Sequence, residues 1–418
     1  MSYFLPPKLP SLKGKRIVVA VCGGIAAYKT CELVRRLIQQ EALVKVVMTE
    51  SACRFIQPLT FQALTGQPVA ISQWPSADHA SSMPHIELGR WAELLLVAPC
   101  TANTLAKIAH GLAGNLLENL ILARQCPVAI APAMNVEMWQ NSATQRNLAQ
   151  IKADGIHILG PNYGEQACGE IGLGRQLESE ELLLELAKLF TPQGWAGRHI
   201  LLTAGPTLEN IDPVRALTNL SSGKMGYNLA LTAWLRGAEV CLVSGPTALN
   251  KLYQLQTVQV NTGKQMHEQV FGYLQSHPVA LFLGVAAVAD YCIKNPSAHK
   301  QKKQKNGFAQ LQFELEFNPD ILAQVSQFRD QKSPHLKVVG FAAETENLET
   351  YAQNKLTDKN SDLIVANLVQ DAMANDHNCV KMYQRFKNSP VIAQGCKFSV
   401  AQQIFDLIET NYETSSTT

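Results

Sequence analysis

Short runs of β-branched and aliphatic residues alternate with segments of helical spacing along the first half of the chain. The runs at 15–21, 44–48, 94–98 and 128–131 have the length and composition of buried strands. The segment 25–39, which follows the first run, has the apolar spacing of a helix. Strands and helices that alternate in this way predict a doubly wound α/β fold with a parallel sheet.

Small and polar residues follow these predicted strands, and they are the first candidates for binding. Ligands of doubly wound sheets bind beyond the carboxyl ends of the strands. A Gly pair between strand and helix lets backbone N–H groups approach an anion, although a plain tight turn has the same sequence. No acidic residue stands where a dinucleotide needs one, so a mononucleotide is favoured over NAD. The residues at these strand ends are Gly23, Gly24, Thr49, Thr101, Asn103 and Asn135.

The alternation restarts after a boundary at 191–194, where Thr-Pro-Gln-Gly follows a predicted helix that ends at Phe190. Two α/β domains are therefore predicted, residues 1–190 and 191–418. The tail from Glu409 to Thr418 is expected to be frayed. The second domain has predicted strands at 199–203, 239–243, 280–283, 337–341 and 362–366, and predicted helices at 226–236, 264–275 and 346–356.

Length and composition narrow the class of protein. A chain of 418 residues that is 46% apolar suffices for more than one full-sized core. The net charge of +2 gives no argument for nucleic acid or a membrane surface as partner. The ten cysteines form no Cys-x-x-Cys pair and no zinc-like spacing. With neither a signal peptide nor an apolar stretch long enough for a membrane span, we expect a cytoplasmic protein with reduced thiols.

Residues 167–175 place one thiol, Cys168, among three glycines. That composition favours a bending, mobile segment rather than a helix or strand, and a ligand can reach a cysteine there. A surface turn with an incidental cysteine is the alternative. His85 stands at the start of another predicted helix. A lone histidine there is more often a surface or capping residue, so only suitable neighbours would make it an acid or base.

The second half offers hydroxyls, glycines and a cation at 203–207 and 219–226, a composition that suits phosphate although the P-loop spacing is absent. Asp290 ends a buried strand, where it would serve equally well as a helix cap. A polar loop follows, and a lysine run of this kind is ordinarily a solvated surface. Its lysines are Lys300, Lys302, Lys303 and Lys305.

Four ordered motifs of the first half resemble the flavin-dependent cysteine decarboxylases, and more closely the decarboxylase half of the bacterial bifunctional coenzyme A biosynthesis family. They are Gly-Gly-Ile-Ala-Ala-Tyr-Lys at 23–29, His-Ile-Glu-Leu at 85–88, Pro-Ala-Met-Asn at 132–135 and Ala-Cys-Gly-Glu at 167–170. The resemblance covers about residues 1–190. It implies a flavodoxin-like domain that binds FMN, oxidises the cysteine moiety of 4′-phosphopantothenoylcysteine, releases carbon dioxide and returns the electrons to give 4′-phosphopantetheine.

Roles for residues of the first half follow from the same resemblance. His85 is implied to be the base or orienter, Asn135 to bind the substrate carboxylate, and Cys168 to donate a proton in the reductive step. Cys22 and Cys100 stand at positions where the family often differs, and backbone contacts to the flavin are expected to tolerate both.

The second half, over about residues 191–410, resembles the phosphopantothenate–cysteine ligase half of that family. The matching segments are 203–207, 219–226, 284–291, 318–321 and 340–345. The resemblance implies a Rossmann-like α/β domain that activates 4′-phosphopantothenate with CTP, as an acyl-cytidylate, before cysteine displaces CMP. Lys300 and a magnesium ion (Mg2+) would offset the charge on the α-phosphate. The implied CTP contacts are Gly284, Val285, Ala286, Asp290, Lys300, Pro319, Asp320, Ile321, Leu322, Phe341, Lys355 and Lys359.

Asn219, with Arg215 as a weaker candidate, is implied to handle the acyl-cytidylate or 4′-phosphopantothenate. Leu220 and Cys292 stand where relatives commonly have His and Arg, which puts contacts there in doubt. The family also implies a homo-oligomer, with a dodecameric decarboxylase core and flavin sites at subunit contacts.

Two alternative functions are compatible with part of these sequence features. The first is a regulatory flavoprotein subunit of the halotolerance type, which binds partners without turnover; the presence of His85, Asn135 and Cys168 argues against it. The second is a peptidyl-cysteine decarboxylase or prenyltransferase with an unrelated C-terminal domain. The ligase-like motifs of the second half argue against that one.

Overall fold

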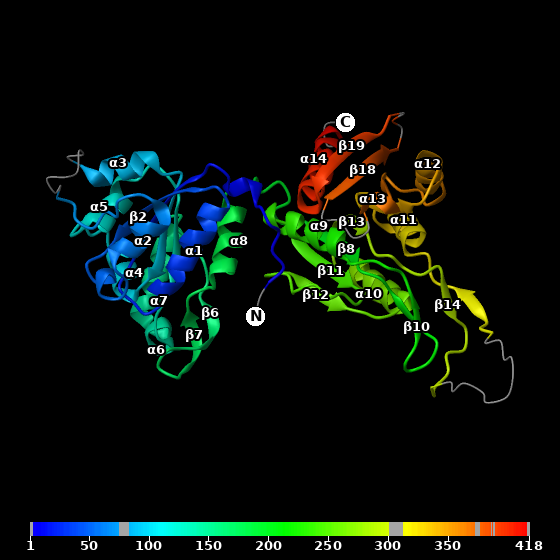
Figure 1. Cartoon of the computed structure of the whole chain (residues 1–418), viewed down its shortest axis with the longest axis horizontal. Helices are drawn as coiled ribbons and strands as arrows, with labels where there is room; N and C mark the ends of the chain where they lie inside the picture. Colours follow the sequence, from blue (N-terminus) through cyan, green and yellow to red (C-terminus); the bar gives the residue numbers. More distant parts are fainter. Residues whose placement is uncertain are drawn as a thin grey trace. The chain divides into compact units, whose positions relative to one another are not determined.

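The computed structural model describes residues 3–74, 83–300, 312–372, 377–385, 387 and 389–415. The chain folds as two compact units. One comprises Pro7–Phe190, and the other combines Met1–Pro6 with Thr191–Thr418. Figure 1 labels many of the elements of both, and each unit is described separately below.

The N-terminal unit is built on a five-stranded sheet in the order β2-β1-β3-β4-β5, with every neighbouring pair parallel. The strands β1, β3 and β4 are apolar throughout the buried part of their length because helices cover both faces of the sheet. The predicted doubly wound sheet is therefore confirmed. Its strands are β1 (Arg16–Val21), β2 (Leu43–Met48), β3 (Leu94–Cys100), β4 (Val128–Pro132) and β5 (His157–Ile158).

The two faces of this sheet have different coverings. Val18, Ala20, Leu95 and Val97 face a core formed with residues of α3, α4, α5 and α7. On α1, which packs beside α8, the hydroxyl of Thr30 donates to the carbonyl of Ala98 in β3 at 2.8 Å. The helices are α1 (Ala27–Gln39), α2 (Pro58–Thr65), α3 (Pro84–Trp91), α4 (Ala102–Ala109), α5 (Leu116–Ala123), α6 (Val136–Gln140), α7 (Ser142–Ala153) and α8 (Ser179–Leu189), with 3-10 turns at Pro10–Leu12 and Ala52–Arg54.

An antiparallel hairpin, β6 (Asn162–Glu165) and β7 (Ile171–Arg175), joins β5 to α8 and holds Cys168 in its turn. The expectation that residues 167–175 avoid regular structure is wrong for the second half of this segment. Its glycines serve close packing: a Cβ on Gly172 would lie 2.4 Å from the side chain of Val136, and one on Gly174 would lie 2.3 Å from the carbonyl oxygen of Met134.

The C-terminal unit contains an eight-stranded sheet in the order β12-β11-β8-β13-β16-β17-β18-β19. The strands are parallel from β12 to β17, and the last two pairings are antiparallel. This mixed sheet confirms the predicted second α/β domain, to which the antiparallel strands β18 and β19 add an unexpected edge. The strands are β8 (His199–Ala204), β11 (Glu239–Ser244), β12 (Gln256–Gln259), β13 (Val279–Gly284), β16 (Lys337–Glu344), β17 (Leu363–Leu368), β18 (His377–Gln384) and β19 (Val391–Cys396).

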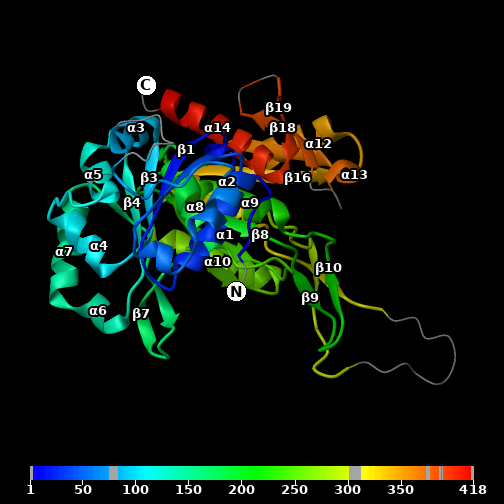
Figure 2. The same cartoon turned by 60° about the vertical axis from the view of Figure 1, so that its left-hand side comes forward.

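Two short antiparallel pairs lie beside one another away from this sheet, as Figures 1 and 2 both show. They are β9 (Leu208–Asn210) with β10 (Ala216–Thr218), and β14 (Tyr291–Ile293) with β15 (Leu315–Phe317). The helices of this unit are α9 (Lys224–Leu235), α10 (Gly263–Ser276), α11 (Ile321–Lys332), α12 (Leu348–Asp358), α13 (Val369–Ala372) and α14 (Lys397–Ser415). Among the described residues, no helix is both long and apolar enough to cross a membrane.

The C-terminal helix α14 corrects the expectation of a frayed tail from Glu409 onward, since it continues to Ser415. Glu409 is held from two sides. The indole N–H of Trp195 donates to its carboxylate at 2.7 Å, and Arg236 forms an ion pair with it at 2.6 Å. Arg236 also pairs with Asp406 one turn earlier. These partners lie more than 160 residues away in sequence, so the local composition of the tail gave no sign of them.

The packing of β7 generates a stability prediction. We expect Gly174→Ala to destabilise the N-terminal unit by about 2–4 kcal/mol, because the new Cβ adds both a positive-φ strain and a clash with backbone. Gly169→Ala is the matched control: its φ is +85°, but no atom lies within 4 Å of the added Cβ. Thermal unfolding should show a clearly smaller loss for Gly169→Ala, and equal losses would contradict the close-packing role of Gly174.

Candidate functional site

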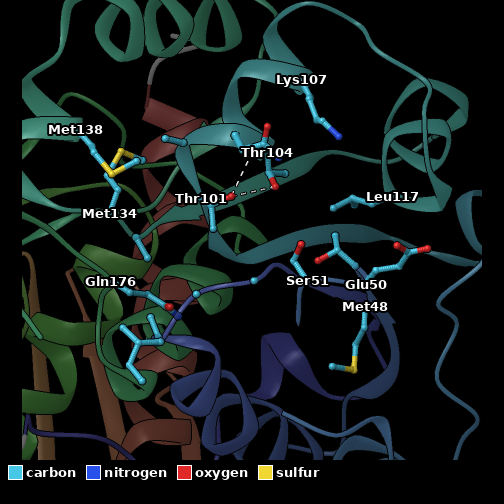
Figure 3. A pocket seen from close by; sticks show the side chains of 18 of the residues that line it. Met48, Glu50, Ser51, Thr101, Thr104, Lys107, Leu117, Met134, Met138 and Gln176 are labelled. Carbon is cyan, nitrogen blue, oxygen red and sulfur yellow. Dashed lines mark hydrogen bonds between the residues drawn. The ribbon is translucent and has the colours of Figure 1, made fainter. Parts of the chain in front are cut away.

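A cavity of about 1140 Å³ opens in the N-terminal unit at the carboxyl ends of the strands. Seven of the predicted site residues line it together: Gly23, Gly24, Thr49, Thr101, Asn103, Asn135 and Cys168. Figure 3 shows Thr101 and Thr104 inside it, with Met134 and Met138 on one side and Leu117 on the other. The sequence therefore identified residues that are brought together in space although they lie on separate strand ends.

The glycine turn after β1 forms one wall of the cavity. A Cβ on Gly23 would lie 2.4 Å from the Cβ of Ser51, so only glycine fits there. On Gly24 an added Cβ would make an ordinary contact of 3.6 Å with Thr101, so the lack of a side chain leaves open space on the cavity side. This turn leads directly into α1 and presents backbone N–H groups at the start of that helix, which is an arrangement suited to an anion.

The threonines at the neighbouring strand ends fix the loops around the cavity. Thr101 is the N-cap of α4: its hydroxyl oxygen accepts from the backbone N–H of Thr104 at 3.3 Å. Thr49 accepts from the N–H of Ala52 at 3.2 Å. Both side chains thus hold short loops in place at the ends of their strands.

Asn135, Cys168 and Glu170 form a polar cluster at the edge of the cavity. Asn135 caps α6, with its amide oxygen accepting from the N–H of Glu137 at 2.9 Å. Its amide nitrogen donates to the carboxylate of Glu170 and lies 3.5 Å from the sulfur of Cys168. That sulfur is 3.7 Å from Glu170. The exposed thiol therefore lies beside an amide donor and a carboxylate, on a hairpin turn above the cavity.

Several cavity residues were missed by the sequence analysis. Lys107 and the buried Glu118 form an ion pair at 2.7 Å. Lys29, also buried, pairs with Glu178 at 2.8 Å. Burial alone would raise the pKa of Glu178, but the hydrogen bond and charge of Lys29 bring that pKa below its usual value. Gln176 is 1% exposed. Of these residues, only Lys29 could have been found from the sequence, because it is the last residue of the motif at 23–29 and lies in the first turn of α1.

The two cysteines that depart from the family pattern do not line the cavity. Cys22 and Cys100 are buried, and the sulfur of Cys22 accepts from the hydroxyl of Thr104 at 3.3 Å. Burial raises the pKa of Cys22 to about 11 and that of Cys100 well above the usual thiol value. Both thiols are therefore protonated at neutral pH and act as small core residues.

His85 is the predicted site residue of this half that does not line the cavity. It lies in the first turn of α3, and its Nδ1 is buried with no hydrogen-bond partner among the residues that the structure describes. Within one chain, the structure therefore does not bring His85 together with Asn135 and Cys168.

In the C-terminal unit, the loop after β13 gathers part of the second predicted site. The hydroxyl oxygen of Thr203, near the end of β8, accepts from the N–H groups of Val285 and Ala286, both at 3.2 Å. The amide of Asn219 donates to the carbonyl of Ala287 at 3.1 Å. Gly284 ends β13 itself. Asn219 thus lies beside the 284–286 segment, whereas Arg215 is paired with the buried Asp212.

Further predicted residues meet where α11 and α12 approach β16. Asp320 caps α11, accepting from the N–H of Ala323 at 3.0 Å, and forms an ion pair with Lys359. Burial would raise the pKa of Asp320, but the Lys359 contact lowers it below its usual value. Lys355 donates to the carbonyl of Phe341 at 2.8 Å, and burial lowers the pKa of this lysine.

The remaining CTP candidates are residues at the start of α11 and Lys300, and only the first of these groups is bonded to the loop after β13. Pro319, Ile321 and Leu322 surround Asp320 at the start of α11, and Asn318 joins them to the 284–290 loop through a 2.9 Å bond to the carbonyl of Asp290. Lys300 is exposed and makes no hydrogen bond or ion pair with another described residue. The structure therefore does not bring it into contact with the rest, while Lys302, Lys303 and Lys305 lie outside the described residues.

Within the described part of the chain, no three His, Cys, Asp or Glu side chains come together in a way that would hold a metal ion. A magnesium ion that arrives with a nucleotide needs no such cluster, because phosphate oxygens and water supply most of its ligands.

Fold and site together define a flavoprotein-type domain followed by a second α/β domain, and comparison with known protein families agrees. The flavoprotein family matches residues 7–191. The family described as DNA/pantothenate metabolism flavoprotein C-terminal domain matches residues 195–412, which is just over half of the chain.

Full-length relatives match nearly the whole chain. The coenzyme A biosynthesis bifunctional protein CoaBC of Vibrio cholerae is 47% identical over 364 residues, covering 87% of this chain and 90% of that protein. Its Escherichia coli counterpart is 43% identical and covers 96% and 98%, and that of Bacillus subtilis is 40% identical and covers 97% and 100%. The chain belongs to this family of bifunctional coenzyme A biosynthesis proteins, and it is a bifunctional enzyme.

Solved structures match each half separately. The C-terminal domain of a coenzyme A biosynthesis bifunctional protein CoaBC aligns with 53% of this chain at 41% identity and a TM-score of 0.43. A PPC decarboxylase mutant complexed with pantothenoylaminoethenethiol aligns with 43% of it at 35% identity and a TM-score of 0.38.

Proposed function

We propose that this enzyme carries out two consecutive steps of coenzyme A synthesis. The C-terminal half joins cysteine to 4′-phosphopantothenate with CTP, through an acyl-cytidylate. The N-terminal half then decarboxylates 4′-phosphopantothenoylcysteine to 4′-phosphopantetheine with FMN. The observation on which the proposal mainly rests is the cluster of Asn135, Cys168 and Glu170 at the edge of a cavity with a glycine turn that suits a phosphate.

The residues of the N-terminal cavity fit a flavin mononucleotide. The turn at Gly23 and Gly24 leaves room on the cavity side and offers N–H groups to a phosphate, while Thr49, Thr101 and Asn103 add side-chain donors. FMN, when bound, would supply the two-electron oxidation of the cysteine moiety that permits loss of carbon dioxide, and would take part in the reduction that follows. The protein contributes binding, orientation and protons.

Asn135 and Cys168 act on the substrate in this proposal. The amide nitrogen of Asn135 already donates to a carboxylate, that of Glu170, so its orientation suits the carboxylate of a substrate. Cys168 holds the proton that the enethiol product of decarboxylation takes up when it is reduced.

We also propose that His85 acts across a contact between copies of the chain. Ile25 and Tyr28 line the cavity but are 62% and 58% exposed, as expected if a second subunit covers them. A neighbouring copy would then bring its own His85 to the cavity. Such a contact is consistent with the homo-oligomer, a dodecamer, that the family resemblance implies.

In the C-terminal half we propose that CTP binds along the 284–290 loop, the start of α11 and two lysines at the end of α12. Lys355 and Lys359 offer positive charge there, and Mg2+ accompanies the triphosphate. Asn219, next to the same loop, would contact 4′-phosphopantothenate or its acyl-cytidylate, with Arg215 as a further candidate. Lys300 would reach the α-phosphate when the nucleotide is present.

The test of the whole proposal is an assay of the purified chain. With 4′-phosphopantothenate, CTP, cysteine and Mg2+, the yellow protein should release pyrophosphate and carbon dioxide in equal amounts. A regulatory flavoprotein would release neither. A flavin enzyme with an unrelated C-terminal domain would release no pyrophosphate.

Cys168→Ser should lower the yield of 4′-phosphopantetheine at least ~10²-fold, because the reductive step loses its proton donor. Pyrophosphate release should continue at the normal rate. Without oxygen, the visible absorbance of the oxidised flavin should bleach when 4′-phosphopantothenoylcysteine is added and should not return. Cys31→Ser, a cysteine of the same unit outside the cavity, is the control. A normal yield from the Cys168 variant would overturn its role.

Lys300→Gln should slow pyrophosphate release by ~10²–10³-fold, since a preorganised charge at a transition state contributes that much. Decarboxylation of supplied 4′-phosphopantothenoylcysteine should not change. Lys294→Gln is the matched control, because this lysine is exposed and forms a surface ion pair with Glu314 at 2.5 Å. Equal rates for the two variants would leave Lys300 as a solvated surface residue.

A further inference from the structure

Gln176 is a buried amide whose polar atoms are unsatisfied. It follows β7, is 1% exposed and lines the cavity of the N-terminal unit. Neither its Oε1 nor its Nε2 has a hydrogen-bond partner among the described residues. Each such buried group has lost its hydrogen bonds to water without gaining a replacement, which destabilises the folded protein. The protein keeps both within a cavity that we assign to a ligand, which indicates that the ligand supplies the missing partners.

The backbone around Gln176 is firmly held, so the side chain cannot easily turn away. The buried ammonium of Lys29 lies 3.3 Å from the carbonyl oxygen of Gln176 and pairs with Glu178. Glu178 also pairs with Arg175 at 2.6 Å. On either side of Gln176, the chain is therefore fixed between α1 and α8, and Figure 3 places its side chain among those that surround the cavity.

The hydrogen-bonding groups of the Gln176 carboxamide limit which part of a ligand can pair with it. It presents one acceptor and one donor group side by side, and both are unpaired here. A phosphate has only acceptors and would leave Oε1 unsatisfied. The pyrimidine edge of a flavin ring carries carbonyl acceptors next to an N–H donor and satisfies both. We propose that Gln176 forms paired hydrogen bonds with this edge of the ring and thereby positions it. The inference rests on the flavin site proposed above.

Gln166 provides an internal comparison. It lines the same cavity and carries the same amide, yet its Oε1 accepts from the N–H of Val136 at 3.0 Å and its Nε2 donates to the carbonyl of Leu173 at 3.3 Å. The Gln166 amide supports the hairpin, whereas the Gln176 amide has no hydrogen-bond partner in the described part of the chain.

The experiment compares Gln176→Met and Gln166→Met in the full chain, with and without FMN. Methionine keeps the length of the side chain and removes the amide. Flavin-free Gln176→Met should unfold at the same temperature as the wild type or higher, because an unsatisfied buried amide is removed. Its dissociation constants for both FMN and riboflavin should rise roughly tenfold, and the visible bands of the bound flavin should shift. Flavin-free Gln166→Met should instead lose stability.

Each other outcome counts against the proposal. An unchanged affinity and spectrum would show that Gln176 does not contact the flavin. Weaker binding of FMN with unchanged binding of riboflavin would assign Gln176 to the phosphate. Weaker binding of both with an unshifted spectrum would assign it to the ribityl chain. If the wild-type chain bound neither flavin, the proposed flavin function itself would fail, a result distinct from all of these.

Discussion

One backbone contact makes the first site possible. The N–H of Met134, just beyond β4, donates to the carbonyl of Gly174 in β7 at 2.9 Å. This approach is close enough that side chains on Gly172 or Gly174 would collide with the segment after β4. Because the two backbones touch, Asn135 on one and Cys168 on the other meet at 3.5 Å although they are 33 residues apart in sequence. The chemistry proposed for the cavity depends on that meeting.

The sequence predicted the central strands of both sheets because a strand buried on both faces is a continuous apolar run. It also singled out residues that line the cavity of the N-terminal unit, since the ends of parallel strands converge on one edge of a sheet. The β7 strand escaped prediction because glycine has two opposite uses. Glycine makes an unpacked segment flexible, and it also lets another segment pack against the backbone more closely than any side chain would allow. Only the position of Val136 and Met134 distinguishes these cases.

Other residues also could not be predicted from the local sequence, because their importance depends on contacts with residues far away along the chain. Gln176 looks like any polar residue until its burial and its lack of partners are seen. In the C-terminal unit, Lys355 and Lys359 sit in and just after a helix with no local motif of their own, and only the family resemblance singled them out. His85 was predicted from its motif, yet its neighbours within one chain do not explain it. The role proposed for it depends on a contact between copies of the chain, which a single sequence encodes only indirectly.

The contact between Trp195 and Glu409 has a consequence for how the protein is made. Trp195, at the start of the C-terminal unit, is buried, and the acceptor for its indole N–H lies 214 residues further along the chain. A ribosome therefore finishes almost the entire polypeptide before this unit is able to close its core. Every strand of the N-terminal sheet, in contrast, has emerged by residue 158. We therefore expect the N-terminal half to fold first during synthesis.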